Sequence, residues 1–291
     1  CDECSGGNSG HVAGSDIDDF GLCFNNNSLQ GAIDAAPSGG TLTVPGGTYA
    51  ETITLDKSLT LTGSGSVTGG VVIAADDVTI DGLSLSGSLD GANSVITVDN
   101  SNVRTNITIS NCVLDGDNDG KKAFHGKNSI GGSLIFDGNT IRNMTDWFVM
   151  DNTSSQNDVA YALEYVAFNN NTLENVHGSI AFRGHPENAI DYAEVIGNTA
   201  NYGSTLNNFW ASIEVNNASY IEAAYNEIHG IRAANQSGSW GDWGEHHALQ
   251  FWNKVGAWTL DVHDNDLSGN DQGIAIATNG DFIVPGGSIY N

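Results

Sequence analysis

One ten-residue pattern recurs along this chain at nearly regular intervals. Its clearest copy is Leu134–Asn143, LIFDGNTIRN, in which apolar and polar residues alternate on both sides of a Gly-Asn turn. The sixth position of successive copies holds Leu83, Cys112, Asn139, Asn171, Asn198, Asn226 and Asn265. Neighbouring members are 27 to 32 residues apart, except for one step of 39. Such a period is typical of solenoids, in which each repeat buries its apolar face only against its neighbours.

The composition agrees with many short strands and restricts the partners. The chain has 291 residues, with 37 Gly and 4 Pro, and 9 Lys+Arg against 35 Asp+Glu. The formal net charge of −26 excludes nucleic acid as a partner, because nucleic-acid binding needs clustered cations. It disfavours an anionic membrane surface for the same reason. An acidic excess of this size suits an extracellular protein, a calcium binder or a high-salt environment.

The segment Ser28–Gly65, SLQGAIDAAPSGGTLTVPGGTYAETITLDKSLTLTGSG, resembles the opening of right-handed parallel β-helix proteins. That superfamily includes pectate lyases and pectin methylesterases. The resemblance implies an all-β, right-handed parallel β-helix solenoid whose first coil is capped by a short helix, here Leu29–Ala36 after Ser28. It implies no single activity, since this fold hosts lyases, hydrolases, esterases, phage spikes and adhesins.

The expected organisation has two parts. Residues 1–22 are polar and rich in Gly, Ser and Asp, and they are interpreted as a leader or tether. Residues 23–291 are interpreted as the β-helix, which we expect to continue beyond Asn291. In stacked coils, equivalent positions lie about 4.8 Å apart. The column of Asn residues is therefore predicted to form an internal ladder of hydrogen bonds, with a structural and not a catalytic role.

A second strand in each repeat is predicted to carry the functional side chains. Alternation sends two columns outward. One column is Asp99, His125, Asp151, Arg183, Asn216, Trp252 and Ala277. The neighbouring column is Thr97, Ala123, Val149, Ala181, Glu214, Gln250 and Ala275. In β-helix polysaccharide enzymes the substrate lies along such a sheet, and the resemblance implies the same place here.

This face is the main candidate for chemistry. Asp151 or Glu214 would act as acid/base or cation ligand, and Arg183 would neutralise a uronate carboxylate or stabilise developing negative charge. His125 or His185 would move a proton. The aromatic and amide side chains predicted to bind substrate are Trp147, Trp252 and Gln250. The alternative is an ordinary exposed face, on which Arg183 pairs with an acid of a neighbouring coil.

The long step in the repeat reflects an insertion, Gly230–His247, that contains Trp240 and Trp243. Long loops in regular repeats usually carry function, and these rings are predicted to form a glycan-binding wall. The alternative is a loop that packs its own Trp residues onto the solenoid. A copper or zinc site at His246 and His247 is disfavoured, because adjacent residues on a strand point to opposite faces.

The segment Asp115–Gly120, DGDNDG, matches the first half of a calcium loop. Asp115, Asp117 and Asp119 are the predicted Ca²⁺ ligands, because alternating carboxylates converge on a hard cation. Gly126 stands where the twelfth-position Glu would be, so an Asp/Gly turn remains the alternative.

Four cysteines give two different expectations. Cys112 belongs to the inward column and is predicted to be a buried free thiol. Near the N-terminus, a Cys4–Cys23 disulfide would leave Cys1 alone, as in a bacterial lipoprotein that carries a lipid anchor on its first residue. The alternatives are a Cys1–Cys4 or Cys1–Cys23 bridge, or a metal or redox site at the CxxC pair.

The motifs of known β-helix enzymes do not indicate one enzyme class for this sequence. Gly280–Gly286, GDFIVPG, shares only DFI with the pectin methylesterase segment GxxDFIFG, and pectate lyase signatures are absent. The leading hypothesis is a secreted or cell-surface protein that binds a polysaccharide or surface glycan, with cleavage as a lyase or hydrolase left open. The rival hypothesis is a non-catalytic adhesin, filament or scaffold that self-assembles or carries additional domains after Asn291.

Overall fold

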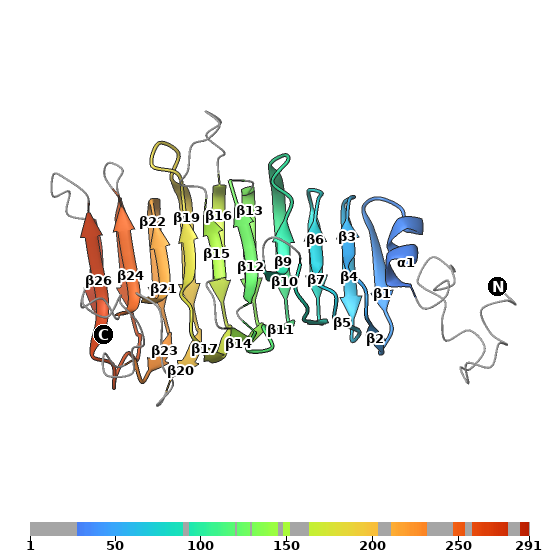
Figure 1. Cartoon of the computed structure of the whole chain (residues 1–291). Coiled ribbons are helices and arrows are strands. Elements are labelled where there is room, and N and C mark those ends of the chain that lie inside the picture. The colour runs from blue at the N-terminus through green and yellow to red at the C-terminus, as the bar shows by residue number, and fades with distance from the viewer. Residues whose placement is uncertain are drawn as a thin grey trace, which may run out of the picture.

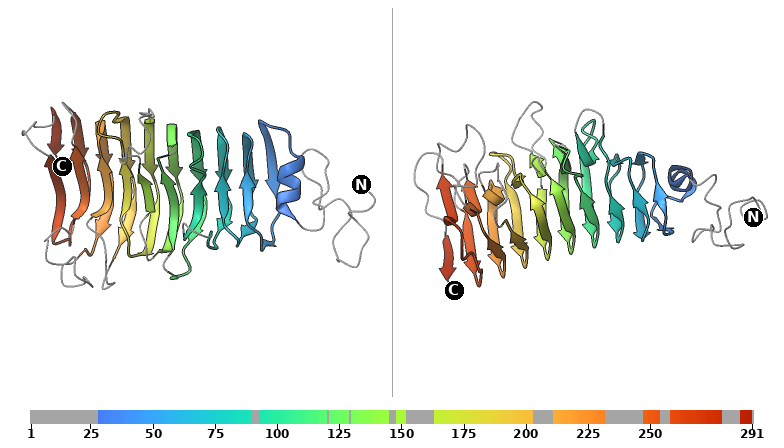
Figure 2. Two further views of the ribbon diagram at one scale, coloured as in Figure 1. Left: turned by 45° about the horizontal axis from the view of Figure 1, so that its top comes forward. Right: turned by 60° about the horizontal axis from the view of Figure 1, so that its bottom comes forward.

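The chain folds into a right-handed parallel β-helix with three sheets (Figure 1). The computed structural model describes residues 28–89, 93–119, 121–128, 130–144, 148–151, 163–202, 211–231, 247–253, 258–278 and 286–290. Every strand pairing between two coils is parallel, and the coils follow one another along a single axis (Figure 2). The expected fold is therefore confirmed. The predicted leader and the first three cysteines lie outside the described residues.

The first sheet contains the strands that precede the ladder positions. In spatial order it consists of β1 (Gly40–Val44), β4 (Leu59–Gly63), β7 (Val78–Asp81), β10 (Arg104–Ser110), β13 (Ile130–Asp137), β16 (Leu163–Asn169), β19 (Ile190–Ile196), β22 (Ala218–Ala224), β25 (Thr259–His263) and β27 (Gly286–Tyr290). The short second sheet follows the ladder positions. It consists of β2 (Thr48–Tyr49), β5 (Ser66–Val67), β8 (Ser84–Leu85), β11 (Val113–Asp115), β14 (Thr140–Met144), β17 (Thr172–Val176), β20 (Thr199–Asn201) and β23 (Glu227–His229).

The third sheet carries the predicted functional columns. It consists of β3 (Ile53–Leu55), β6 (Val71–Ile73), β9 (Ser94–Val98), β12 (Lys122–Lys127), β15 (Phe148–Asp151), β18 (Ile180–Arg183), β21 (Ala211–Asn216), β24 (His247–Asn253) and β26 (Gln272–Thr278). Apolar side chains fill the solenoid between the sheets, and phenylalanine rings pack against one another in its middle coils. Phe148 of this sheet, for example, stacks on Phe124 at 5.3 Å between ring centroids and packs edge-on against Phe136 of the first sheet at 4.8 Å.

Helix α1 (Leu29–Ala35) covers the first coil, as expected (Figure 1). The side chain of Ser28 accepts a hydrogen bond from the amide of Gly31, which satisfies one of the free donors of the first turn. The carboxylate of Glu51 completes the cap, because Oε1 accepts from the Leu29 amide at 2.6 Å and Oε2 accepts from the Ser28 hydroxyl at 3.0 Å. No helix among the described residues is long and apolar enough to cross a membrane.

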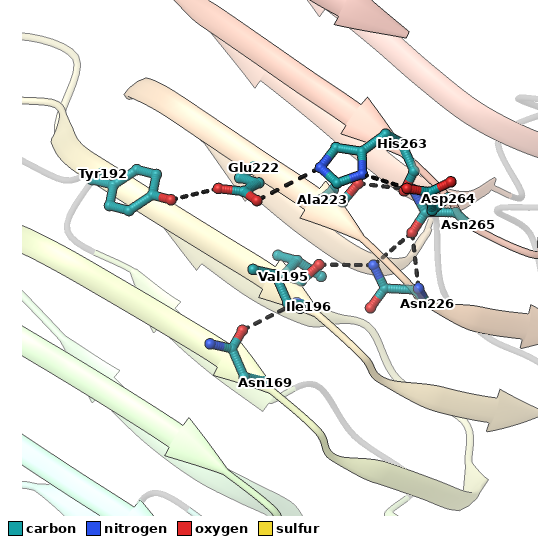
Figure 3. A network of polar contacts seen from close by, with 10 residues as sticks. All are labelled: Asn169, Tyr192, Val195, Ile196, Glu222, Ala223, Asn226, His263, Asp264 and Asn265. Atoms are coloured by element: carbon teal, nitrogen blue, oxygen red, sulfur yellow. Dashed lines mark hydrogen bonds and ion pairs between the residues drawn. The ribbon is translucent and has the colours of Figure 1, made fainter. Parts of the chain in front are cut away.

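The asparagine ladder is present, and its hydrogen bonds connect successive coils; Figure 3 shows the step from Asn226 to Asn265. Oδ1 of Asn198 accepts from both the backbone amide and Nδ2 of Asn171, at 2.9 and 3.1 Å. Nδ2 of Asn198 donates to the carbonyl of Phe168 at 2.7 Å and to Oδ1 of Asn226 at 2.9 Å. The same pattern continues from Asn226 to Asn265. Each side chain thus satisfies backbone groups of the preceding coil in the interior of the solenoid, which gives these residues a structural role.

Cys112, the second member of this column, is a buried free thiol, as predicted. Its amide donates to Oδ1 of Asn139 at 2.9 Å, so the ladder ends at this coil. Burial raises the pKa of the thiol to about 11, and the nearby backbone hydrogen bonds only partly offset that effect. The thiol is therefore protonated and unreactive at neutral pH.

Candidate functional site

The third sheet brings five predicted site residues, Trp252 among them, together on its outward face. Asp151 pairs in register with Arg183, Arg183 with Asn216, and Asn216 with Trp252. In the neighbouring column, Glu214 pairs with Gln250. We call Asp151, Arg183, Glu214, Asn216 and Gln250 the Arg183 site. They come from four successive coils, which is possible because parallel stacking aligns equivalent positions.

The register of β12 differs from the expectation by two residues. His125 pairs with Thr97 and Val149, so it belongs to the column of Glu214 and not to that of Asp151. Lys127 pairs with Asp151 instead. The reason lies in the core, where Phe124 pairs with Ile96 and stacks on the ring of the next coil. A shift by two preserves the outward face of each residue but changes its neighbours.

The centre of the Arg183 site is a buried ion pair. Nε of Arg183 donates to Oε1 of Glu214 at 2.8 Å, and Nη2 donates to Oε2 at 3.2 Å. The side chain of Glu214 is only 2% exposed, whereas those of Arg183 and Asp151 are 22% and 16% exposed. Oδ2 of Asp151 lies 3.9 Å from Nη1 of Arg183. One guanidinium therefore lies between two carboxylates. Its two parallel hydrogen bonds to Glu214 favour the charged forms of both Arg183 and Glu214.

These contacts keep Arg183 ionised. Burial alone would lower the pKa of the guanidinium, but the attraction and hydrogen bonds of Glu214, together with the charge of Asp151, raise the pKa above its ordinary value. Glu214 also accepts a hydrogen bond from Nδ2 of Asn216. With three donors directed at its two oxygens, Glu214 positions the surrounding side chains.

Two carboxamide oxygens of the site have no hydrogen-bond donor among the described residues. They are Oδ1 of Asn216 and Oε1 of Gln250, and both atoms are buried. The residues as a whole are 2% and 7% exposed. A buried acceptor without a donor costs about 1 to 3 kcal/mol, so such atoms are rare unless they serve a purpose. The sequence places both residues on this face but gives no information about their missing donors.

His185 lies just beyond the end of β18, in a tight turn. It forms an isolated bridge with Asn188, and its Nδ1 accepts the amide hydrogen of Glu187 at 3.1 Å. The proton-transfer role of His185 stays a prediction, as does that of His125.

Of the predicted aromatic residues, the described part of the chain includes only Trp252. It lies half-buried on β24, beside Asn216 of the preceding coil. Trp147, Trp240, Trp243 and His246 lie outside the described residues, so the proposed glycan-binding wall is not tested.

The acidic turn after β11 has internal partners. Asp115 accepts hydrogen bonds from Nε of Arg142 at 2.7 Å and Nδ2 of Asn143 at 3.0 Å, and Asp117 pairs with Lys121 at 3.1 Å. The hydrogen bonds from Asn143, from the Asp117 amide and from Arg142 outweigh burial and lower the pKa of Asp115. Within the described residues, no three His, Cys, Asp or Glu side chains converge on a possible metal position. Calcium binding by Asp115, Asp117 and Asp119 stays a prediction.

A second cluster of titratable side chains lies on the outward face of the first sheet (Figure 3). The hydroxyl of Tyr192 donates to Oε2 of Glu222 at 2.7 Å, and Oε1 of Glu222 lies 3.6 Å from Nε2 of His263. Nδ1 of His263 lies 3.0 Å from Oδ2 of Asp264. The hydrogen bond with Asp264 and the surrounding acids, Asp261 among them, raise the pKa of His263 above its ordinary value, although desolvation opposes them.

The sequence analysis missed this cluster, although its signal is present. Tyr165, Tyr192 and Tyr220 each precede a ladder asparagine by six residues, and they stack in register. The ring centroids of Tyr165 and Tyr192 are 5.7 Å apart, and those of Tyr192 and Tyr220 are 5.0 Å apart. The regular spacing of these tyrosines from the ladder is the signal in the sequence that indicates the column.

Comparison with known proteins assigns neither a family nor an activity to the chain. No protein-family model matches the chain, and no curated protein matches it. Among solved structures, a crystal structure of a pectin methylesterase in complex with a hexasaccharide is similar, at 12% sequence identity. The match covers 90% of this chain and 88% of the other, with a TM-score of 0.38. A likeness this low assigns no activity, and the β-helix assignment rests on the sheet topology itself.

Proposed function

We propose that this protein binds a polysaccharide at the Arg183 site, along the outward face of the third sheet. The observation that carries the proposal is the register of Asp151, Arg183, Asn216 and Trp252, which places charged, amide and aromatic groups in one line across successive coils. A linear array of such groups suits a linear chain of sugar units. A location outside the cell, favoured by the acidic composition, belongs to the same proposal.

Each group has a distinct role in the proposed binding. The indole of Trp252 offers an apolar face on which a sugar ring stacks. The partly exposed carboxylate of Asp151 accepts hydrogen bonds from sugar hydroxyls. Glu214 is buried and accepts hydrogen bonds from Arg183 and Asn216, so in a binding role it positions these two side chains.

Cleavage of the bound glycan is the second candidate function, and the two carboxylates beside Arg183 favour it. Glycoside hydrolysis uses a pair of carboxyl groups, one as acid and the other as nucleophile or base. Asp151 and Glu214 are the pair that this site offers. Bond cleavage would produce reducing ends, whereas a lyase would produce unsaturated sugars.

The proposal is tested by calorimetric binding to a panel of neutral and acidic oligosaccharides, with and without calcium. We expect at least one glycan to bind, and we expect Trp252→Ala and Asp151→Asn to weaken that binding tenfold or more. The control is Asp56→Asn, a change at an exposed carboxylate on another part of the solenoid. Reducing-end and ultraviolet assays on the same samples detect hydrolase and lyase products.

Three outcomes would count against the proposal in different ways. Binding without product would exclude cleavage and leave a binding protein. Equal affinity in Trp252→Ala and wild type would move the site away from this face. Absence of binding across the panel would reject the proposed function and favour a scaffold or assembly role.

A further inference from the structure

The unpaired oxygens of Asn216 and Gln250 define a subsite within the Arg183 site. Asn216 pairs in register with Trp252, and Gln250 pairs with Glu214, so the two amides are diagonal neighbours on adjacent coils. Both residues are more than nine-tenths buried. Neither oxygen has a donor among the described residues. Two acceptors without donors among the described residues therefore belong to diagonal neighbours on the proposed glycan-binding face.

The orientation of Asn216 follows from its neighbour. A carboxylate can only accept hydrogen bonds, so the Asn216 atom that faces Glu214 must be the amide nitrogen. Arg183 fixes Glu214 in turn through two hydrogen bonds. Oδ1 of Asn216 is thus held away from Glu214 by a buried network. The arrangement is one in which an acceptor is presented in a fixed direction before any ligand arrives.

The charges around the subsite do not favour an anionic ligand. Arg183 is shared between Glu214 and Asp151, and Lys127 lies in register with Asp151. These two cations and two carboxylates sum to zero, and the whole chain carries a formal charge of −26. No surplus positive charge remains in this group for the carboxylate of a uronate. Neutralising a uronate, the role predicted for Arg183 from the sequence, would need a positive charge that Glu214 and Asp151 do not already balance.

We propose that Asn216 and Gln250 form a subsite for a neutral, hydroxyl-bearing sugar, whose hydroxyl groups donate to Oδ1 and Oε1. The inference rests on the proposed polysaccharide binding and names its substrate class. Hydroxyl donors satisfy both oxygens without adding charge, and the neighbouring indole of Trp252 supplies the ring contact. A site built to accept these hydrogen bonds rejects a ligand that lacks the donors.

The experiment compares three hexasaccharide probes by calorimetry. They are a neutral hexose oligomer, its O-methylated counterpart, which keeps the rings but loses donors, and a hexauronate. We expect the neutral oligomer to bind at least tenfold more tightly than either of the others. We also expect Asn216→Leu/Gln250→Leu to reduce that affinity tenfold or more. Asn102→Leu, at an exposed position outside this sheet, is the matched control and should bind as wild type does.

The outcomes separate this inference from the proposed function. Preferential binding of the hexauronate, weakened by Trp252→Ala, would overturn the neutral subsite and leave polysaccharide binding intact. Equal affinity for the O-methylated probe, or unchanged affinity in Asn216→Leu/Gln250→Leu, would also overturn it. Failure of every probe to bind would reject both proposals. Circular dichroism of each variant confirms that a lost affinity does not reflect a lost fold.

Discussion

The interior ladder and the Arg183 site both contain buried asparagines, but they treat the amide group differently. Asn198 and Asn171 are fully buried, and every polar atom of their side chains has a partner in a neighbouring coil. Asn216 is nearly as buried, and its Oδ1 has no donor among the described residues. The same residue type is thus a structural element in one region and an incomplete contact in the other.

This difference shows how to separate structure from function in a solenoid. Burial and stacking alone do not separate them, because both sets of residues are buried and stand in stacked columns of the solenoid. Hydrogen-bond satisfaction does separate them, since a buried amide with all its partners stabilises the fold, whereas an unpaired oxygen costs stability and leaves an acceptor for a ligand hydroxyl or a water molecule. The following predictions test this distinction, from the largest expected effect to the smallest.

Breaking the ladder should have the largest effect. Asn198→Leu removes the acceptor of the Asn171 amide and side chain and the donor to the Phe168 carbonyl, and leaves these groups buried. We expect the free energy of unfolding to fall by about 5 kcal/mol, from several unsatisfied groups at about 1 to 3 kcal/mol each. Urea denaturation measures the change. A loss below about 1 kcal/mol would contradict the structural role of the ladder.

Removing the cation of the Arg183 site should have the next largest effect. Arg183→Met leaves the buried carboxylate of Glu214 without its counter-ion, which we expect to cost about 3 kcal/mol of unfolding free energy. The double change Arg183→Met/Glu214→Leu removes both charges and should recover most of this loss. If the double variant were as unstable as the single one, the ion pair would not be the cause.

The smallest expected effect concerns His263, two residues before the last ladder asparagine. Its folded-state pKa is raised, chiefly by Asp264, above an unfolded value of about 6.5. The stability that His263 contributes is therefore fully present below about pH 6.5 and is lost as pH rises through the folded-state pKa. Titration by NMR should show a raised pKa that falls in Asp264→Asn. An unchanged pKa in that variant would reject the assigned cause.

The sequence predicted the repeat, the ladder and the outward column because these depend on periodicity and alternation alone. It could not predict the burial of Glu214, since alternation assigns a residue to a face and not the degree of cover over that face. The predicted column of His125 was wrong. Two registers that differ by two residues place the same side chains outward, and the packing of Phe124 decides between them. The sequence also could not show that Oδ1 of Asn216 and Oε1 of Gln250 lack donors among the described residues, because this depends on the positions of the surrounding atoms.

The most direct test of the central distinction compares the stability of two matched variants without any ligand. Asn216→Leu/Gln250→Leu removes the two unpaired oxygens and also the hydrogen bond from Nδ2 of Asn216 to Glu214, so that a gain and a loss of stability largely offset each other. Asn198→Leu replaces an amide whose polar atoms are all paired. We predict that urea denaturation will show the double variant within about 1 kcal/mol of wild type, or more stable, while the ladder variant loses several times that amount. A double variant as destabilised as the ladder variant would mean that Asn216 and Gln250 support the fold, and it would contradict their assignment to a binding site.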